Sequence, residues 1–363
     1  MKRTIVTLMV LLAAVLFAAC GSTQTQTQAN STGVTSYYVC ANGNDSNAGT
    51  SENAPFKTLA KAIQEASKTT VKKITVIGTL TGNTVIRDTG SDEILITGKP
   101  DTVENEKAVI ITESGILLDI HNGSKIRLEY ITLSGALNST GVRRGLTVSD
   151  GAIITLGKNV VITQFDVGSN NGAGIYLEGT LYMTDNALIT GNTARAGGGL
   201  RIAANGSATM QDESSITYNT STVIEEGIGG GGVSIGGRGT FTMRGSSSIY
   251  GNKAVCGGGI FIQSGTLIIE GNAAIRDNEA NVGSNSLLYG GGGIYIWGGS
   301  AALKENSLVT GNRAIYGGGV YTKGNLVFEG GRISGQGGAY QFNTGSIRGN
   351  SAGNGSDVWE NYQ

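Results

Sequence analysis

The chain has 363 residues, of which 60 are glycine and only 2 are proline. This composition excludes collagen, which needs both residues in a strict triplet, and a hydrophobic content of 39% argues against wholesale disorder. The net charge of −1 and the single histidine, His121, leave little for a basic nucleic-acid surface or for histidine-based catalysis. We therefore expect an all-β repeat protein with frequent glycines, no nucleic-acid partner and no cofactor.

The N-terminus has the organisation of a bacterial secretory signal. Lys2 and Arg3 precede a short apolar run, which is not long enough for a comfortable membrane span. The segment Phe17-Ala18-Ala19-Cys20-Gly21 resembles the bacterial lipobox, with Phe17 at the position where leucine is usual. We expect residues 1–19 to be the signal peptide and Cys20 to carry a lipid. The alternative is an ordinary signal that is cleaved nearby, with Cys20 incidental.

The stretch that follows Cys20 is typical of a flexible tether. Residues 21–36 have almost no apolar side chains and no charge, so they cannot pack into a core. A lipid-anchored domain needs such a spacer, whereas a plain secreted domain does not. We therefore assign residues 20–36 to the lipidated cysteine and its tether, which predicts attachment to a membrane in the cell envelope, at the outer membrane or the cell surface.

The mature domain is expected to begin with a cap, within residues 37–110 together with the first irregular coils. Phe56, Leu59, Ala60 and Ile63 fall on one face of a helix predicted over 55–67, with Pro55 near its start. An open end of a β-structure exposes strand edges, and a helix over that end prevents edge-to-edge association.

Two motifs recur in one phase through residues 111–363, the predicted repeat domain. One motif is a glycine run before an aliphatic residue, and the aliphatic positions are 25, 33, 27, 34 and 26 residues apart. These positions are Ile175, Leu200, Val233, Ile260, Ile294 and Val320. The other motif is aliphatic-x-x-Asn, and its asparagines are Asn192, Asn219, Asn252, Asn278, Asn312 and Asn350. Such self-similarity is the signature of a repeat architecture.

Each unit contains three short runs that alternate between apolar and other residues, as strands with one buried face do. Three strands of three to five residues cannot bury a face alone, but stacked units form one continuous core. The repeat therefore predicts a single-stranded right-handed parallel β-helix of at least eight coils. We interpret the glycines and asparagines as structural, since glycine allows close backbone approach and asparagine amides can stack in a ladder.

The two remaining cysteines, Cys40 and Cys256, are expected to be unpaired. The repeat places them many coils apart, at about 4.8 Å per coil. A disulfide needs Cα atoms within about 7 Å. We expect Cys256 to pack as a small apolar residue.

The segments Tyr37-Tyr38-Val39, Asn42-Gly43-Asn44-Asp45 and Pro55-Phe56-Lys57-Thr58 resemble the N-terminal cap of pectate-lyase-like β-helix proteins, including family 9 polysaccharide lyases. The repeats resemble those of the polymorphic outer-membrane protein family, with Gly-Gly-Gly-Ile and Ile-x-x-Asn in place of that family's motifs. The resemblance implies the β-helix fold. For a lyase it would also imply a basic residue and calcium-binding acids, and for a galacturonan hydrolase several converging aspartates.

Candidate binding residues lie on the outward-facing position of the first strand of each unit. This row contains Asp119, Thr147, Tyr176, Arg201, Ser234, Phe261, Tyr295 and Tyr321. It offers one acid and one arginine that are coils apart, so no catalytic or metal site is assigned. Its aromatic strip, with Trp297 nearby, can stack on sugar rings or enter a protein interface. We single out Tyr176, Arg201, Phe261, Tyr295 and Tyr321 as ligand-binding candidates.

Two units are longer by about seven residues, at Thr220–Gly229 and Asn281–Gly290. Insertions on one face of a solenoid often mark its binding surface. We expect their apolar residues to be exposed; these are Val223, Ile224, Leu287, Leu288 and Tyr289.

Two functional hypotheses follow. The first is a bacterial surface lipoprotein whose rigid β-helix is an adhesive or structural interaction module for a host or matrix protein or glycan. The second is a polysaccharide lyase or a glycan-binding protein of the pectate-lyase-like fold. The absence of a carboxylate cluster in the outward rows favours the first hypothesis and a role without catalysis.

Lipidation at Cys20 is directly testable. Metabolic labelling with a palmitate analogue should label the wild-type protein but not Cys20→Ser, because only the cysteine thiol accepts the lipid in this motif. Equal labelling of both proteins would contradict the predicted anchor.

Overall fold

The computed structural model describes residues 35–100, 107–136, 141–225, 227–280, 290–314, 317–336, 347–349 and 358–360. The predicted signal, Cys20 and nearly all of the tether lie outside the described residues. Ser36, the last residue assigned to the tether, is buried, and its hydroxyl lies 2.8 Å from that of Thr75. The folded contacts therefore begin one residue before the predicted boundary.

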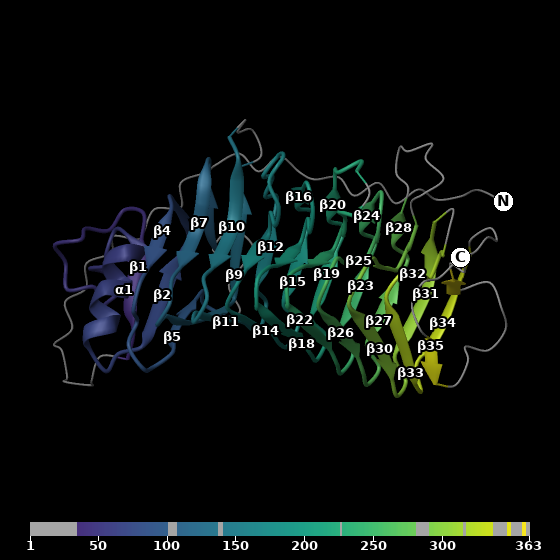
Figure 1. Cartoon of the computed structure of the whole chain (residues 1–363). Coiled ribbons are helices and arrows are strands. Elements are labelled where there is room, and N and C mark those ends of the chain that lie inside the picture. Colours follow the sequence, from purple (N-terminus) through teal and green to yellow (C-terminus); the bar gives the residue numbers. More distant parts are fainter. Residues whose placement is uncertain are drawn as a thin grey trace, which may run out of the picture.

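Three long sheets run side by side along the molecule, and successive turns of the chain add short strands to each of them (Figure 1). The twelve-stranded sheet contains β1 (Tyr37–Cys40), β2 (Lys73–Ile77), β5 (Ile94–Thr97), β8 (Lys125–Glu129), β11 (Ile153–Leu156), β14 (Thr180–Met183), β18 (Ser207–Met210), β22 (Thr240–Met243), β26 (Thr266–Ile269), β30 (Ser300–Lys304), β33 (Asn325–Glu329) and β35 (Ile347–Gly349).

The ten-stranded sheet contains β4 (Thr84–Ile86), β7 (Gly115–Ile120), β10 (Arg143–Val148), β13 (Ile175–Leu177), β17 (Leu200–Ile202), β21 (Val233–Ile235), β25 (Ile260–Ile262), β29 (Ile294–Ile296), β32 (Val320–Thr322) and β36 (Val358–Glu360).

The fourteen-stranded sheet contains β3 (Thr79–Thr81), β6 (Ala108–Thr112), β9 (Ile131–Gly135), β12 (Val161–Thr163), β15 (Leu188–Thr190), β19 (Ser215–Thr217), β23 (Ser248–Tyr250), β27 (Ala274–Arg276), β31 (Leu308–Arg313), β34 (Arg332–Gln336), and the two-residue strands β16 (Thr193–Ala194), β20 (Thr220–Ser221), β24 (Lys253–Ala254) and β28 (Glu279–Ala280). The chain is therefore a parallel β-helix, as the repeat predicts.

Corresponding residues of successive coils stack in register. Leu200 pairs with Val233, Val233 with Ile260, and Ile260 with Ile294, and all four side chains are fully buried. They belong to one core cluster that extends from Tyr37 in the cap to Ile333. The aliphatic position of the glycine motif is thus the inward position of the ten-stranded sheet, and burying it in every coil stabilises the stack.

The asparagine motif forms a buried ladder. The side-chain amide of Asn192, Asn219, Asn252 and Asn278 donates to Oδ1 of the next asparagine along the series at 2.9, 3.1, 2.9 and 2.9 Å. That same oxygen accepts the backbone N–H of the donating asparagine at 2.9 to 3.0 Å. The structural interpretation is confirmed for the asparagines from Asn192 to Asn312, because their amides satisfy buried backbone groups at the corners of these coils. Asn350 lies outside the described residues.

The glycine runs pack against this ladder. A Cβ on Gly259 would lie 3.0 Å from Nδ2 of Asn278, and a Cβ on Gly258 would lie 2.5 Å from the carbonyl oxygens of Glu279 and Gly292. Gly257 has a φ of +61°, which L side chains rarely adopt. The two motifs keep one phase because each glycine run is the close neighbour of an asparagine.

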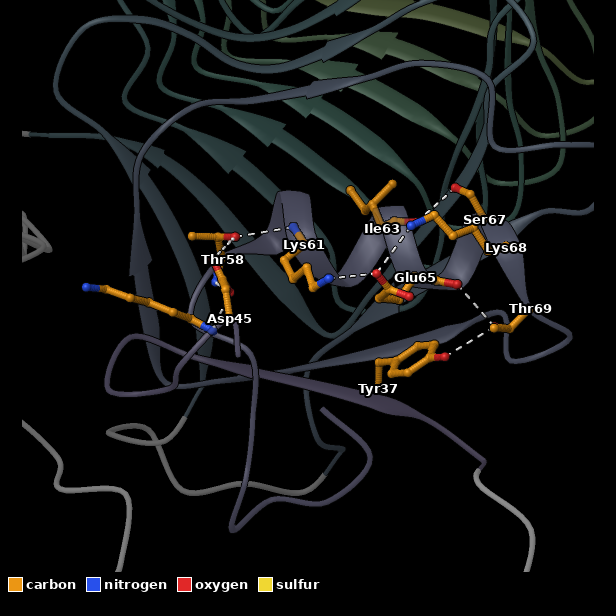
Figure 2. A network of polar contacts seen from close by, with 10 residues as sticks. Tyr37, Asp45, Thr58, Lys61, Ile63, Glu65, Ser67, Lys68 and Thr69 are labelled. Carbon is orange, nitrogen blue, oxygen red and sulfur yellow. Dashed lines mark hydrogen bonds and ion pairs between the residues drawn. The ribbon is translucent and has the colours of Figure 1, made fainter. Parts of the chain in front are cut away.

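Helix α1 (Leu59–Lys68) covers the N-terminal end of the stack, next to β1 (Figure 1). It starts four residues later than the predicted start at Pro55. Thr58 is the N-cap, and its hydroxyl accepts the Lys61 N–H at 3.2 Å, as Figure 2 shows. An N-cap hydroxyl satisfies an otherwise unpaired N–H of the first turn, so it decides where the helix begins.

The buried face of α1 also differs from the predicted one. Leu59, Ala62, Ile63 and Ala66 are buried, whereas Ala60 is exposed. Phe56 is buried as well, but it lies before the helix. With Leu59, Ala62, Ile63 and Ala66 forming the buried stripe, Ala60 lies roughly 100° from the centre of that stripe, on the solvent side.

Hydrogen bonds from the start of helix α1 to Asp45 hold the helix against the loop that precedes it. The Asp45 carboxylate accepts the N–H groups of Lys57 and Thr58 at 2.9 Å each and the Thr58 hydroxyl at 2.8 Å. Burial acts to raise the pKa of Asp45, but these hydrogen bonds and the charge of Lys61 bring it below its ordinary value. At the other end of the helix, the hydroxyl groups of Tyr37 and Thr69 form a hydrogen bond of 3.3 Å (Figure 2).

The cysteine prediction is confirmed. In the described structure both Cys40 and Cys256 are buried, and no disulfide joins them.

Candidate functional site

The predicted outward row on the ten-stranded sheet exists as one stack of register partners. Consecutive pairs join Asp119 to Thr147, Thr147 to Tyr176, Tyr176 to Arg201, Arg201 to Ser234, Ser234 to Phe261, Phe261 to Tyr295, and Tyr295 to Tyr321. Parallel pairing therefore places successive side chains of the row about 4.8 Å apart along the axis.

The row divides into two parts at Ser234. Asp119, Thr147, Tyr176 and Arg201 are half-buried and reach solvent; we call these four residues the exposed half. From Ser234 onward the side chains are buried, with Phe261 and Tyr295 at 0% and Tyr321 at 8% exposure. The sheet face thus presents polar side chains to solvent on its N-terminal coils. On the later coils its aromatic side chains are buried.

The buried rings form a second, outer hydrophobic cluster with Val255 and Cys256. Phe261 and Tyr321 each meet Tyr295 edge to face, with ring centroids 5.3 and 4.6 Å apart. Trp297 packs against this cluster from its half-buried position, 6.1 Å from Tyr295. Edge-to-face aromatic pairs of this kind stabilise packing beyond the burial of their area.

The expectation of an exposed aromatic shelf is therefore wrong for Phe261, Tyr295 and Tyr321. The alternation correctly placed them outside the main core, but they pack with Val255 and Cys256 into a second cluster that is itself buried. Gly227 of the first insertion lies near the edge of this cluster, since a Cβ there would be 3.6 Å from the ring of Trp297. No part of Phe261 or Tyr295 is accessible to a ligand in this structure.

The first insertion contains one buried and one exposed apolar residue. Val223 is 5% exposed, contrary to expectation, and its N–H bonds to the carbonyl of Arg195 at 3.3 Å. Ile224 is 72% exposed, as predicted. Leu287, Leu288 and Tyr289 of the second insertion lie outside the described residues.

Arg144 lies next to the exposed half, over the ring of Tyr176, although the sequence analysis missed it. Strand β10 begins at Arg143, three residues before the expected first apolar position, and the guanidinium carbon of Arg144 lies 5.0 Å from the ring centroid of Tyr176. The signal was available: Arg143-Arg144-Gly145-Leu146 stands in phase with the next coil's Gly172-Ala173-Gly174-Ile175, with two arginines in place of small residues.

Backbone groups of the next coil hold Arg144 in place. Its Nε donates to the carbonyl of Gly172 and one terminal nitrogen donates to that of Asn171, both at 3.0 Å. The other terminal nitrogen lies 3.4 Å from the Thr147 hydroxyl. Burial lowers the pKa of Arg144, and the nearby Tyr176 and Asp119 act in the opposite direction.

Arg201 is held in a similar way on the other side of Tyr176. It donates to the Ser234 hydroxyl at 2.6 Å and to Oε1 of Gln263, two coils further on, at 3.3 Å. A Cβ on Gly236 would lie 2.3 Å from one of its terminal nitrogens, so glycine at 236 provides the room for the guanidinium. Burial lowers the pKa of Arg201, and Tyr176 opposes the shift.

Asp119 and His121 form a pair at the first coil of the exposed half. Nε2 of His121 lies 3.0 Å from Oδ2 of Asp119, and the two side chains are 35% and 24% exposed. His121 follows the end of β7 and is partly exposed, and its ring turns back to the carboxylate of Asp119.

Within the part of the chain that the structure describes, no three His, Cys, Asp or Glu side chains gather closely enough to hold a metal ion. Over the same residues, no helix is both long and apolar enough to cross a membrane. No family model matches the chain, and neither the curated proteins nor the solved structures gave a match.

The burial of the aromatic row changes what a substitution there should do. We expect Phe261→Ala to lower the free energy of unfolding by about 3–5 kcal/mol, because it opens a cavity in the outer cluster. Tyr182→Ala, at a ring that is 41% exposed on the twelve-stranded sheet, should cost clearly less. Denaturant unfolding followed by circular dichroism measures both. Similar losses would mean that the outer cluster is not packed as described.

Proposed function

We propose that this chain is a bacterial envelope protein whose β-helix is a rigid interaction module, with the exposed half of the ten-stranded sheet as its binding surface. The observation that carries this proposal is the division of the outward row. Asp119, Thr147, Tyr176 and Arg201 reach solvent one coil apart, while the continuation of the row is buried. Binding and catalytic residues are often held on rigid scaffolds, and register-paired strands are such a scaffold.

The attachment of this module to a membrane is proposed from the sequence. A lipid on Cys20 followed by an uncharged tether would hold the β-helix at the outer membrane or the cell surface, free to meet a host or matrix component. One saturated chain gives only weak membrane binding, so stable attachment would require the several acyl chains of a bacterial lipoprotein anchor.

A second candidate function, a glycan-active enzyme, is favoured by the pair of Asp119 and His121. The guanidinium of Arg144 is near enough for the charge of Asp119 to act on it, so an acid, a titratable ring and a cation share one surface. General acid–base catalysis on a glycosidic bond needs such groups within reach of one bond. However, the described coils place a single carboxylate in this row, whereas hydrolases use a pair.

The binding surface can be blocked without assuming what it binds. In a chain that begins at residue 20 and carries Cys20→Ser, Thr147→Cys provides an accessible thiol for a maleimide-linked polyethylene glycol, since Cys40 and Cys256 are buried. The polymer at 147 should weaken binding to any partner found on a host-matrix protein and glycan array at least about tenfold, because it covers the exposed half. The measurement is array binding followed by titration of each hit.

The matched control attaches the same polymer at Thr242→Cys, on the outward side of the twelve-stranded sheet. This variant should bind like the unlabelled chain. Equal loss at both sites, or no effect of the polymer at 147, would count against this sheet face as the binding surface. Cleavage of a glycan on the array, lost in Asp119→Asn, would favour the enzyme.

A further inference from the structure

Tyr218 is an exposed aromatic residue on a strained backbone, at the corner that follows β19. Its φ is +52° and it is 62% exposed. The residues in line with it in the neighbouring coils are Gly191 and Gly251, with φ of +65° and +67°. Glycine adopts this conformation without cost, whereas a bulky residue does so rarely, and strained residues of this kind cluster at functional positions. The strain therefore indicates a role for the ring beyond the packing of its own coil.

Residues of the next two coils hold the ring of Tyr218 in place. The ring lies over Gly251, where a Cβ would be 2.5 Å from its Cε1. Tyr250 meets it edge to face, with ring centroids 5.5 Å apart. The guanidinium carbon of Arg276 lies 4.1 Å from the Tyr250 centroid, and Nη1 of Arg276 forms an ion pair of 3.0 Å with Oδ2 of Asp277. We call Tyr218, Tyr250, Arg276 and Asp277 the Tyr218 patch.

The face of the fourteen-stranded sheet beside the Tyr218 patch is uncharged, and two ion pairs border it. The outward positions of β12, β15, β19 and β23 are partly exposed except for Thr217; they are Val161, Thr163, Leu188, Thr190, Ser215, Thr217, Ser248 and Tyr250. The bordering pairs are Arg276 with Asp277 and Lys253 with Glu279, the latter at 3.3 Å. A partner that covers this face therefore does not have to supply a charge to match it.

A second copy of this chain is the partner that fits this face. Strand pairing spaces the rows of side chains about 4.8 Å apart, so a partner makes repeated contacts only where its own groups recur at that spacing. A second copy has the same spacing, and a two-fold axis sets the same rows of both copies against each other. Each copy offers both signs of charge in the two ion pairs, and the chain's net charge of −1 adds little repulsion. Tyrosine and arginine are also enriched in protein interfaces.

We propose that two copies of this chain associate through the Tyr218 patch and the outward face of β12, β15, β19 and β23, about a two-fold axis normal to the sheet. This interaction surface belongs to the fourteen-stranded sheet and is separate from the exposed half on the ten-stranded sheet. The inference goes beyond the proposed function, because one copy can bind a partner through one sheet and a second copy through another.

The size of this face predicts a weak dimer. The five strands β12, β15, β19, β23 and β27 span about 24 Å along the axis, and the three residues of each strand span about 10 Å across it. Such a face belongs to the class of interfaces below about 1,200 Å² in total, which form transient complexes. Attachment of both copies to one membrane, as proposed for Cys20, would raise their effective concentration and the fraction that is paired.

Sedimentation equilibrium tests the proposal on the chain that begins at residue 20 and carries Cys20→Ser. We expect the average mass to rise from that of a monomer toward that of a dimer as the concentration increases up to about 500 µM. Tyr218→Gly should weaken the association at least about tenfold, because it removes the exposed ring. Glycine is the residue of both neighbouring coils and is favoured at this φ, so the variant should fold.

The matched control is Tyr182→Thr, which removes a ring that is 41% exposed on the twelve-stranded sheet and introduces the residue of both neighbouring coils, Thr155 and Thr209. It should leave the dissociation constant of the dimer within about twofold, since it lies on a different face. The polymer used above for residue 147 should prevent association when it is attached at Ser248→Cys, on the outward side of β23, but not at Thr242→Cys.

A monomer at every concentration would overturn the proposal, and so would equal weakening by Tyr218→Gly and Tyr182→Thr. Growth beyond the dimer would also overturn it, because a two-fold contact uses the same face of both copies and closes at two. A dimer that persists with the polymer at residue 248 would place the contact elsewhere and contradict the proposed face. The polymer at residue 147 covers a different sheet, so binding through the exposed half is judged separately.

Discussion

The hydrogen-bonded column of buried asparagines is the constraint on which the rest of this structure depends. In the coils from Asn192 to Asn312 the chain turns a tight corner at its asparagine, where backbone groups are removed from water and must find partners. The side-chain amide satisfies a carbonyl of the preceding coil and the next asparagine at once; Asn219, for example, donates to the Ile189 carbonyl and to Asn252, both at 3.1 Å. A slip of one residue between coils would leave several of these buried groups unpaired.

This register determines the surface as well as the core. Once Leu200 lies beside Val233, Arg201 must lie beside Ser234 and Tyr176 beside Arg201. The exposed half is therefore a consequence of the repeat, and its spacing is that of paired strands. What varies from coil to coil is the side chain at each outward position; in this row Arg201 follows Tyr176, and Arg144, from outside the row, lies over the Tyr176 ring. The same regularity lets distant residues such as Arg201 and Gln263 meet across two coils.

Much of the fold could be predicted because the same pattern of apolar, glycine and asparagine positions recurs in successive coils. The alternation placed Ile260 inside and Phe261 outside the main core, and the two motifs placed the asparagines in one column. The burial of Phe261 could not be predicted in the same way. Alternation separates the two faces of a strand, but it does not reveal whether a distant loop or a neighbouring aromatic ring covers the outer face.

The candidate site was predicted in part. Tyr176 and Arg201 were found because they occupy the regular outward position, whereas Arg144 was missed because it stands where other coils have a small residue. His121 follows a strand, so nothing in the sequence indicated that its ring would reach Asp119. The start of α1 shifted for a local reason, since the hydroxyl of Thr58 caps the helix and Pro55 does not. Arg144 and His121 lie at positions that differ from the repeat pattern, and a repeat pattern gives little information about such positions.

The most direct test of this account compares the free energies of unfolding of Asn252→Ala and Asn186→Ala, both measured by denaturant unfolding. Asn252 donates to Asn278 and accepts from Asn219 inside the stack, while the exposed Asn186 exchanges similar bonds with Asn159 at 2.6 and 2.8 Å near solvent. Losing Asn252 leaves buried groups unpaired and should lower the free energy of unfolding by at least about 3 kcal/mol. Losing Asn186 should cost about 0.5 kcal/mol, since water can replace it. Equal losses would contradict the claim that the buried column holds the coils in register.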